Sequence, residues 1–414
     1  MPKLKTNTLR LLLLLPVMLC ISIAKAQTFG GNPPSVKWQQ INTPAARIIF
    51  PQGMDSTALR VAAVITRIND AVKSTIGNKQ RQVSIVLQNQ TTETNGYVGL
   101  APFRSEFYLT PQQNSFELGA LPWAEMLAVH EFRHVQQYNN FNVGLSKALR
   151  TVFGEGGQAI GNSLSVPDWF YEGDAVYNET LVSKQGRGRL PFFFNDFRGL
   201  WVADKKYSWM KLRNGSYVDY VPTHYPLGYM VVAYGRETYG DDFWRKVTQD
   251  AAAYKQGIYP FQKAIKKYSG KHYKVFTDSA INYFKQQFND KPTPSPSAHF
   301  VADEEFPVYI DDSTFIYLKS SYDNIPRFII RTGTKEKMIA SRGLAIDHYF
   351  AYNNGKIIYS GYRPDARWGY CNYSEIRVID VNTGSEKAIT RKSKYFSPAL
   401  SGDGKRIVAA EVAT

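Results

Sequence analysis

The chain has 414 residues, of which 50 are Lys or Arg and 35 are Asp or Glu, giving a formal net charge of +15. A hydrophobic fraction of 43% and an aromatic fraction of 14% suffice for a buried core, which excludes wholesale disorder as well as collagen-like and coiled-coil classes. At roughly 100–200 residues per domain, this length predicts two to three domains.

The excess positive charge is spread over many segments and is not gathered in one run. This pattern is typical of a solvated surface, and the alternative is attraction to an acidic envelope surface or an anionic substrate. No nucleic-acid-binding motif is present, so we expect no nucleic-acid partner.

Residues 1–26 have the three parts of a secretory signal. A basic start is followed by a predominantly apolar run at 11–23 and by an Ala-Lys-Ala cleavage site at 24–26. The apolar run is thirteen residues long, too short for a membrane span. We therefore predict an exported protein, periplasmic, at the cell surface or extracellular, with no transmembrane span after signal removal. The signal carries four positive charges and no acid, so the mature chain has a charge of +11 (15 − 4).

The predicted mature chain keeps a single cysteine, Cys371. No intrachain disulfide can form, although export would permit one. Zinc sites built from four cysteines, or from two cysteines and two histidines, are excluded for the same reason. Any bound metal must therefore be held by histidines and carboxylates.

The first stretch, about 36–120, is predicted to mix strands and helices. A helix capped by Asp55 has apolar residues at helical spacing as far as Val72. The Asn-Gly pair at 95–96 is a strong turn signal and predicts a hairpin. The strands expected in this stretch are 47–50, 83–87, 97–100 and 103–109.

Between about 122 and 288 the apolar spacing becomes helical, and Pro122 suits the first turn of a helix. Prolines then alternate with polar residues at 291–298, which predicts a stiff linker. We therefore predict a first domain over 27–290 and a domain boundary in the linker. The helices expected in this domain include 122–138, 144–153, 167–182, 225–239, 241–254, 259–268 and 274–288.

Residues 299–414 have the periodicity of strands. A repeat of roughly 40–50 residues with several strands per unit is typical of a β-propeller blade. The segment at 396–407 resembles the repeat of TolB-like propellers; its sequence is Phe-Ser-Pro-Ala-Leu-Ser-Gly-Asp-Gly-Lys-Arg-Ile. About two and a half units are present, whereas closure needs about four to eight blades. We therefore expect an incomplete all-β propeller and a chain that is a truncated piece of a longer protein. The strands that recur are 315–317, 357–359 and 407–409.

The most informative motif is the H-E-x-x-H segment at 130–134. On a helix, His130 and His134 lie one turn apart on one face, so their imidazoles can hold one zinc ion together. Glu131 lies beside them, where it can act as general base toward a water molecule. The alternative is a pair of core histidines in an amphipathic helix. The chain has only six His, and a chance match is expected about a few times in a thousand such sequences.

Zinc needs a third protein ligand and an open fourth position, and the third His of a metzincin is absent because Asn140 stands there. Glu172 is the better candidate, in the segment Trp-Phe-Tyr-Glu-Gly-Asp-Ala at 169–175. This segment resembles the W-x-x-E-G-x-A segment of gluzincin metallopeptidases, the group with a thermolysin-like core that includes the aminopeptidase N-like enzymes. The resemblance implies that Glu172 is the third zinc ligand. The alternative is an ordinary exposed Glu on a helix.

A third segment, Tyr-Pro-Leu-Gly at 225–228, opens an apolar helical run. It resembles the Y-x-K-G helix of the aminopeptidase N-like branch, with Leu227 in place of the Lys. The resemblance implies that the Tyr225 hydroxyl stabilises the oxyanion of the tetrahedral intermediate. His224 is the alternative electrophile, and a core Tyr at a helix start is the structural alternative.

Two departures separate this chain from the aminopeptidases. His134 and Glu172 have 37 residues between them, about twice the aminopeptidase spacing, and the insert at about 140–166 is read as a hairpin near the cleft, a hairpin against a membrane surface, or packing. The G-x-M-E-N segment that grips a free amine in that branch is also missing, so exopeptidase action is unsupported. The predicted hairpin at 95–109 lies where gluzincins place the edge strand that pairs with an extended peptide.

These observations predict an α+β protein, with a gluzincin-type metallopeptidase domain (a mixed sheet followed by helices) and an incomplete TolB-like β-propeller. The predicted function is that of an exported zinc-dependent endopeptidase acting on peptides or proteins, with the propeller binding substrate or a cell-envelope protein. The alternative is a non-catalytic envelope scaffold built on the propeller, because fold alone does not determine function. Glu131 favours the enzyme, since a purely structural zinc site needs no general base.

Overall fold

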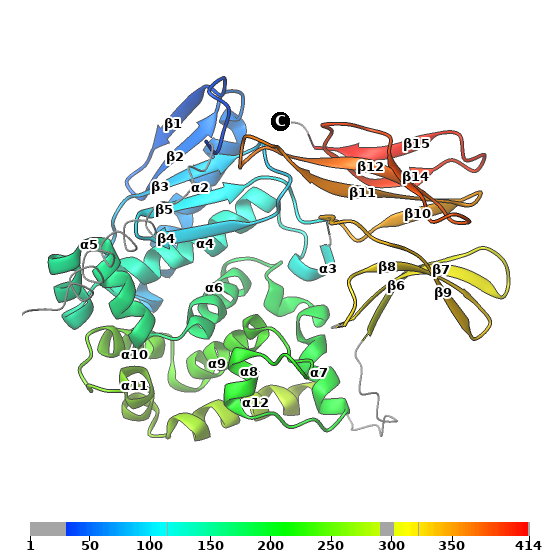
Figure 1. Cartoon of the computed structure of the whole chain (residues 1–414). Coiled ribbons are helices and arrows are strands. Elements are labelled where there is room, and N and C mark those ends of the chain that lie inside the picture. Colours follow the sequence, from blue (N-terminus) through cyan, green and yellow to red (C-terminus); the bar gives the residue numbers. More distant parts are fainter. Residues whose placement is uncertain (1–29, 114, 290–301, 322, 413–414) are drawn as a thin grey trace, which may run out of the picture.

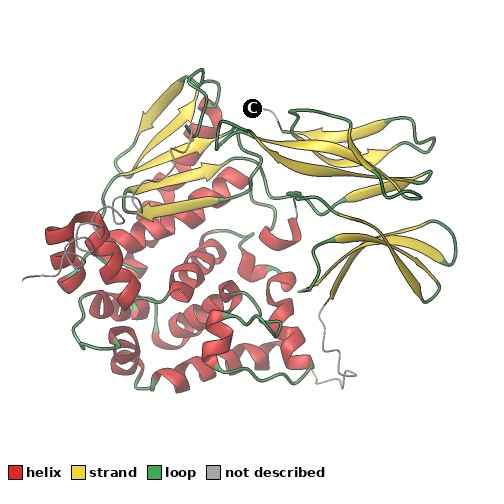
Figure 2. Cartoon of the chain, in the orientation of Figure 1, coloured by secondary structure: helices red, strands yellow, loops and turns green. Residues whose placement is uncertain are grey.

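The computed structural model describes residues 30–113, 115–289, 302–321 and 323–412. The predicted signal, 1–26, and the predicted linker, 291–298, lie outside the described residues. Figure 1 shows the N-terminal sheet above a group of helices, with the C-terminal sheets beside both. Figure 2 shows the helices confined to the N-terminal part and strands alone in the C-terminal part. The described chain is therefore a mixed α/β protein with an all-β C-terminal part.

The N-terminal part begins with a five-stranded sheet in the order β1-β2-β3-β5-β4. Its three central strands are parallel, and β1 and β4 run antiparallel at the two edges. Alternate side chains of β3 are buried, as expected for a strand with one face on the core. The strands are β1 (Trp38–Asn42), β2 (Ala46–Pro51), β3 (Val83–Gln88), β4 (Gly96–Leu100) and β5 (Phe103–Tyr108).

Two helices, α2 (Asp55–Val72) and α4 (Trp123–Asn140), pack against this sheet. The shared core contains Ile65 of α2, Phe132 of α4 and Ile85 of β3, all fully buried or nearly so. Because α4 lies against β4 and β5, the helix that carries H-E-x-x-H runs directly under the sheet edge.

The remaining helices form a layer around a large aromatic core. Trp169 of α6 contacts Trp244 of α10 edge to face, with ring centroids 6.2 Å apart, a favoured arrangement for aromatic pairs. The helices are α3 (Ser115–Leu118), α5 (Gly144–Ser165), α6 (Asp168–Val182), α7 (Asn195–Val202), α8 (Trp209–Asn214), α9 (His224–Tyr239), α10 (Phe243–Ala252), α11 (Pro260–Ser269) and α12 (Tyr273–Phe288).

A buried ion cluster ties three of these helices together. Asp174 of α6 accepts hydrogen bonds from Arg133 of α4, at 2.6 and 3.0 Å, and from Arg236 of α9, at 3.0 Å. All three side chains are almost completely buried. Because removing one partner of a buried ion pair leaves an uncompensated charge, this cluster holds α4, α6 and α9 in a defined arrangement.

The predicted helices are confirmed, with one extension and three omissions. The helix expected at 144–153 continues to Ser165 as α5, after a break at Gly154, where φ is 65° and ψ is −154°. The prediction ended too early because the following segment is rich in glycine. Helices α3, α7 and α8 were not predicted, since each is too short to show a periodic pattern. None of the helices in the described ranges has both the length and the apolar composition needed to cross a bilayer.

The C-terminal part consists of three antiparallel sheets. Two contain four strands, in the orders β6-β7-β8-β9 and β10-β11-β12-β13, and the third pairs β14 with β15. These sheets confirm the predicted change to strands, but the described residues close no ring of blades. The strands are β6 (Ala302–Tyr309), β7 (Thr314–Ser321), β8 (Arg327–Thr332), β9 (Lys335–Ser341), β10 (Phe350–Asn353), β11 (Lys356–Pro364), β12 (Asn372–Asp380), β13 (Glu386–Ala388), β14 (Tyr395–Leu400) and β15 (Ile407–Glu411).

The two parts of the chain meet beyond the end of β3. The buried side chain of Asn372 accepts hydrogen bonds from Thr91 and Thr92. Nearby, the ammonium of Lys394 donates to the backbone oxygen of Asn89 at 3.1 Å. Contacts of this kind join residues about 280–300 positions apart, so they bring the C-terminal sheets against the first sheet.

Candidate metal centre

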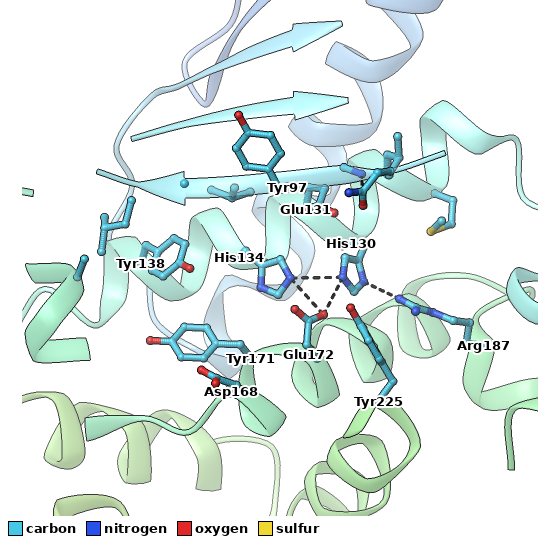
Figure 3. Close-up of a pocket in the computed structure, with 18 of the residues that line it drawn as sticks. Tyr97, His130, Glu131, His134, Tyr138, Asp168, Tyr171, Glu172, Arg187 and Tyr225 are labelled. Atoms are coloured by element: carbon cyan, nitrogen blue, oxygen red, sulfur yellow. Dashed lines mark hydrogen bonds and ion pairs between the residues drawn. The ribbon is translucent and has the colours of Figure 1, made fainter. Parts of the chain in front are cut away.

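Helix α4 presents both histidines of the H-E-x-x-H motif toward α6. His130 and His134 are each about 7% exposed, and their Nε2 atoms lie 3.3 Å apart. Helix α6 brings Glu172 to the same point, with its Oε2 atom 3.2 Å from His130 Nε2 and 3.6 Å from His134 Nε2. Figure 3 shows these three side chains converging from two helices.

The three donor atoms have the spacing that a zinc ion requires. All lie within 4.8 Å of one another. Two ligands of a tetrahedral zinc ion with bonds of about 2.1 Å are about 3.4 Å apart, close to the separations of 3.2, 3.3 and 3.6 Å. Two imidazoles and one carboxylate are also a donor set that zinc accepts. The residues therefore fit this metal.

The other ring nitrogen of each histidine has its own partner. His130 Nδ1 lies 2.5 Å from Glu179 Oε1, and His134 Nδ1 lies 2.8 Å from Gln137 Oε1. Each partner can accept the Nδ1 proton, which leaves both Nε2 atoms free to bind a cation. This is the arrangement of an outer shell that orients metal ligands.

Glu179 is in turn held by Arg187, which donates to both of its carboxylate oxygens at 2.5 and 3.1 Å. Burial alone would raise the pKa of Glu179, but the charge of Arg187 and the hydrogen bond with His130 lower it to about 2. Glu179 therefore stays ionised and remains an acceptor for His130 over the whole physiological range of pH.

The candidate ligands themselves have strongly shifted pKa values. Burial opposes ionisation of Glu172, but the adjacent His134 and His130 hold its pKa well below the ordinary range. Burial would lower the pKa of His130, whereas its hydrogen bonds to Glu172 and Glu179 raise it to about 10. A cation at this point competes with the proton on the imidazole, so its affinity rises with pH.

Glu131 lies on the sheet side of the same helix turn and is about 5% exposed. Burial raises the pKa of its carboxyl, against the opposing effect of the two histidines. Gly96 of β4 lies directly over it: a Cβ atom at position 96 would be 3.1 Å from Glu131 Oε1 and 2.7 Å from Leu127 Cδ2. The turn predicted at 95–96 is wrong: Gly96 is the first residue of β4, and the hairpin turns at 101–102. Because Gly96 has no side chain, the edge strand can approach the general-base candidate.

The two candidate electrophiles occupy different places. Tyr225 lines the cavity beside the ligands, and its hydroxyl points toward Glu172 and His130 (Figure 3). Burial and the Glu172 carboxylate raise the pKa of Tyr225 to about 12, so its hydroxyl keeps its proton. His224 stacks on the Tyr225 ring, with centroids 4.7 Å apart, and is not among the residues that line the cavity.

Two facing glycines bring Tyr225 close to Glu172. A Cβ atom on Gly173 of α6 would lie 2.2 Å from the backbone of Gly228 of α9, and one on Gly228 would lie 2.1 Å from the Trp169 oxygen. Any side chain at either position would separate the two helices. The glycine of the E-G pair therefore has a packing role, and so does the glycine of Tyr-Pro-Leu-Gly.

The cavity at this centre has a volume of about 580 Å³. Strand β4 lines this cavity, and so do the candidate ligands His130, His134 and Glu172. Leu118, Trp123 and Met126 contribute apolar surface, while Tyr138 and Tyr171 add aromatic surface. A cavity of this size with a few convergent polar groups is typical of a ligand or substrate site.

The sequence analysis missed Glu179 and Arg187. A signal for Glu179 was present, since it lies seven residues after Glu172 and therefore two turns along the same face of a helix. Arg187 follows α6 in a 3-10 turn, and no local pattern connects it to the motif.

No family model matches the sequence, and no curated protein matches it. Among solved structures, the chain is similar to an aminopeptidase N family protein from Idiomarina loihiensis, with 9% sequence identity and a TM-score of 0.36. The similarity covers 73% of this chain, and the chain spans 66% of that protein.

Proposed function

We propose that this protein is a zinc-dependent peptidase of the gluzincin type, with His130, His134 and Glu172 as metal ligands. The observation that carries the proposal is the meeting of three donor atoms at tetrahedral spacing, beside a buried carboxylate that is not a ligand. When bound, zinc supplies a Lewis acid and lowers the pKa of a coordinated water to about 7.

The chain's own residues supply the proton transfers. Glu131 takes a proton from the attacking water and later gives it to the leaving amine, a role that suits a carboxyl whose pKa is raised by burial. The protonated hydroxyl of Tyr225 donates a hydrogen bond to the oxyanion that develops on the scissile carbonyl. Its position beside Glu172 and His130 supports this role (Figure 3).

The edge strand supports a peptide as substrate. Strand β4 pairs only with β5 in the described sheet, and its free edge lines the cavity over α4. An extended peptide can add to such an edge through main-chain hydrogen bonds, so that its scissile bond passes over the ligands. Because no amine-gripping G-x-M-E-N segment is present, we propose cleavage within a chain.

For the C-terminal part, we infer the first blades of a TolB-like propeller. Two consecutive four-stranded sheets, each ordered as its strands follow in the sequence, support this inference, because a propeller blade has this topology. The propeller would bind the protein substrate or an envelope partner. Structure determination of the expressed chain tests the inference, since a sandwich or barrel using all the strands would refute it.

The peptidase proposal is tested by metal analysis together with turnover on casein and on a peptide library. We expect one zinc per chain and hydrolysis that a chelator abolishes. Glu131→Gln should keep the metal and lower turnover by about 10²–10⁴-fold, the usual loss for a general base. Glu125→Gln is the matched control, because Glu125 lies in the first turn of the same helix and pairs with Arg60. If Glu131→Gln left turnover unchanged, the activity would belong to another site and the scaffold alternative would be favoured.

A further inference from the structure

The insert between the two halves of the metal site is a helical hairpin. Helix α5 breaks at Gly154, and its second arm folds back on the first: a Cβ atom at Gly157 would lie 2.3 Å from the Leu149 oxygen, and one at Gly161 would lie 2.9 Å from Ser146 Oγ. The two arms are therefore antiparallel and in close contact. Figure 1 shows α5 at the periphery of the molecule, next to β4.

This hairpin exposes an unusual amount of apolar surface. A buried core explains none of it, because the side chains concerned are all exposed. They are Leu145 (45% exposed), Val152 (71%), Phe153 (68%), Ile160 (61%) and Leu164 (72%).

Helical geometry places four of them on one side of the hairpin. Successive residues of a helix are 100° apart, so Leu145 and Val152, seven apart, share a side of the first arm, and Ile160 and Leu164, four apart, share a side of the second. The opposite side is marked by the hydrogen bond from Arg150 to Gln158, at 2.6 Å. We call the surface formed by Leu145, Val152, Ile160 and Leu164, with Phe153 at the tip, the apolar face of α5.

Positive charge surrounds the base and the opposite side of this hairpin. Arg81 and Arg150 share a single carboxylate, that of Glu155, at 2.6 and 3.8 Å. Lys79 and Lys147 lie close enough that the charge of Lys147, together with burial, lowers the pKa of Lys79, and neither has an ion-pair partner among the described residues. Four cations and one carboxylate leave a net charge of +3 (4 − 1) around the base and the opposite side of the hairpin.

We propose that the apolar face of α5 docks on an anionic membrane surface. An interfacial helix has an exposed apolar side rich in Leu and Phe and a basic opposite side, and it lies in the plane of the headgroups without crossing the bilayer. A helix is about 10 Å across, so Lys147 and Arg150, both on α5, lie within about one Debye length of a surface that touches the apolar face and are attracted by anionic lipids.

Docking of the hairpin on a membrane would place the membrane close to the cavity. Ala159 and Ser163, on the second arm of α5, line the cavity, and they neighbour Ile160 and Leu164 in the sequence. A bilayer on the apolar face would therefore lie near the rim of the cavity, where it would bring the site close to polypeptides at the membrane. The docking itself does not depend on the proposed peptidase activity.

The test measures partitioning of the full chain into vesicles by co-sedimentation, with phosphatidylcholine alone and with about one third phosphatidylglycerol. We expect binding to the anionic vesicles. Changing Val152→Ser and Phe153→Ser together should lower the partition coefficient roughly tenfold or more. The matched control changes Leu59→Ser and Val275→Ser, which are also more than half exposed but lie on other helices, and it should bind like the parent.

Two further variants sharpen the test. Phe153→Trp should bind at least as tightly as the parent, since it keeps an interfacial aromatic side chain. Lys79→Gln with Lys147→Gln should reduce the preference for anionic vesicles roughly fivefold or more. Because all variants share residues 1–26, a difference among them does not come from that segment.

The proposal is overturned if the Val152→Ser, Phe153→Ser chain binds vesicles as tightly as the parent. A second result would also overturn it: the parent and this variant bind vesicles equally, but only the variant loses cleavage of a protein substrate. The apolar face would then bind substrate. Loss of self-association in the variant, with vesicle binding unchanged, would assign the face to a second copy of the chain.

Discussion

Each part of the molecule contains a buried ion pair between an Arg and a carboxylate. The two pairs differ in whether their hydrogen bonds lead to the cavity. In the C-terminal sheets, Asp347 accepts hydrogen bonds from Arg342 at 3.1 Å, from Ser360 at 2.5 Å and from the backbone N–H of Ser397 at 2.9 Å. In the helical part, Glu179 accepts from Arg187 and from His130. Both carboxylates are almost completely buried.

The difference lies at the end of each network. The contacts of Asp347 end within the sheets, and it lines none of the cavity at the metal centre. Those of Glu179 continue through His130 to an Nε2 atom that faces Glu172 and the cavity. A buried ion pair by itself is weak evidence for a site. In the proposed function, the same chemistry orients a group that still has a free position for a ligand.

The largest expected effect is the loss of a ligand. His134→Ala should remove both the metal and the hydrolytic activity, because only two protein ligands remain and zinc sites of this kind need three. Metal content by atomic absorption and turnover on casein measure this. His348→Ala, at an exposed His in the C-terminal sheets, is the control and should change neither. Retention of stoichiometric zinc in His134→Ala would contradict the ligand assignment.

The next effect separates the two candidate electrophiles. Tyr225→Phe should keep zinc and lower kcat by about 10²–10³-fold with little change in KM, the usual loss for one oxyanion donor. His224→Ala should have a small effect, since His224 stacks on Tyr225 outside the cavity lining. Steady-state kinetics on one peptide measure both. If His224→Ala were the damaging change and Tyr225→Phe silent, the electrophile would be His224.

Substitutions at the two buried carboxylates, Glu179 and Asp347, test whether only Glu179 supports metal binding. Glu179→Gln should lower zinc affinity about 10–100-fold, the usual effect of losing an outer-shell partner of a ligating histidine. Asp347→Asn should leave zinc affinity unchanged and destabilise the protein by about 3 kcal/mol, because Arg342 loses its partner. Competition with a chelating dye and urea unfolding measure the two quantities. Equal zinc affinities in the two variants would mean that Glu179 is only structural.

The smallest effect concerns the contact between the two parts. Burial lowers the pKa of Lys394 to about 8 from 10.5. Below about pH 8 the ammonium is charged in both the folded and the unfolded chain, so the full cost of burying the charge is present. Between about pH 8 and 10.5 only the folded chain loses this proton, so the stability of the folded protein rises with pH. Lys394→Met should therefore stabilise the protein by about 1–2 kcal/mol at pH 7, and the gain should vanish near pH 10.5.

Urea unfolding at the two pH values measures this gain. Lys387→Met is the matched control, since Lys387 is exposed on β13, and it should change stability little at either pH. A Lys394→Met chain no more stable than the parent at pH 7 would show that Lys394 is solvated in the folded protein.

The sequence by itself determined most of the elements and the candidate residues of the centre. Helical spacing placed His130, Glu131 and His134 on one helix, because residues one turn apart on a helix share a face whatever surrounds them. The W-x-x-E-G-x-A resemblance selected Glu172, and the change from helical to strand periodicity near 299 separated the two parts. All of these signals are local, and local patterns survive without knowledge of the packing.

Only the tertiary structure decided which groups meet. The distance between Glu172 and the histidines depends on the packing of α6 against α4 and α9, where Gly173 and Gly228 allow the close approach. The partnership of Glu179 with Arg187, and the exposure of the apolar face of α5, depend on which surfaces the rest of the chain covers. Periodicity shows that a helix has an apolar side, but only packing shows whether that side is buried, because burial is a property of contacts between distant segments.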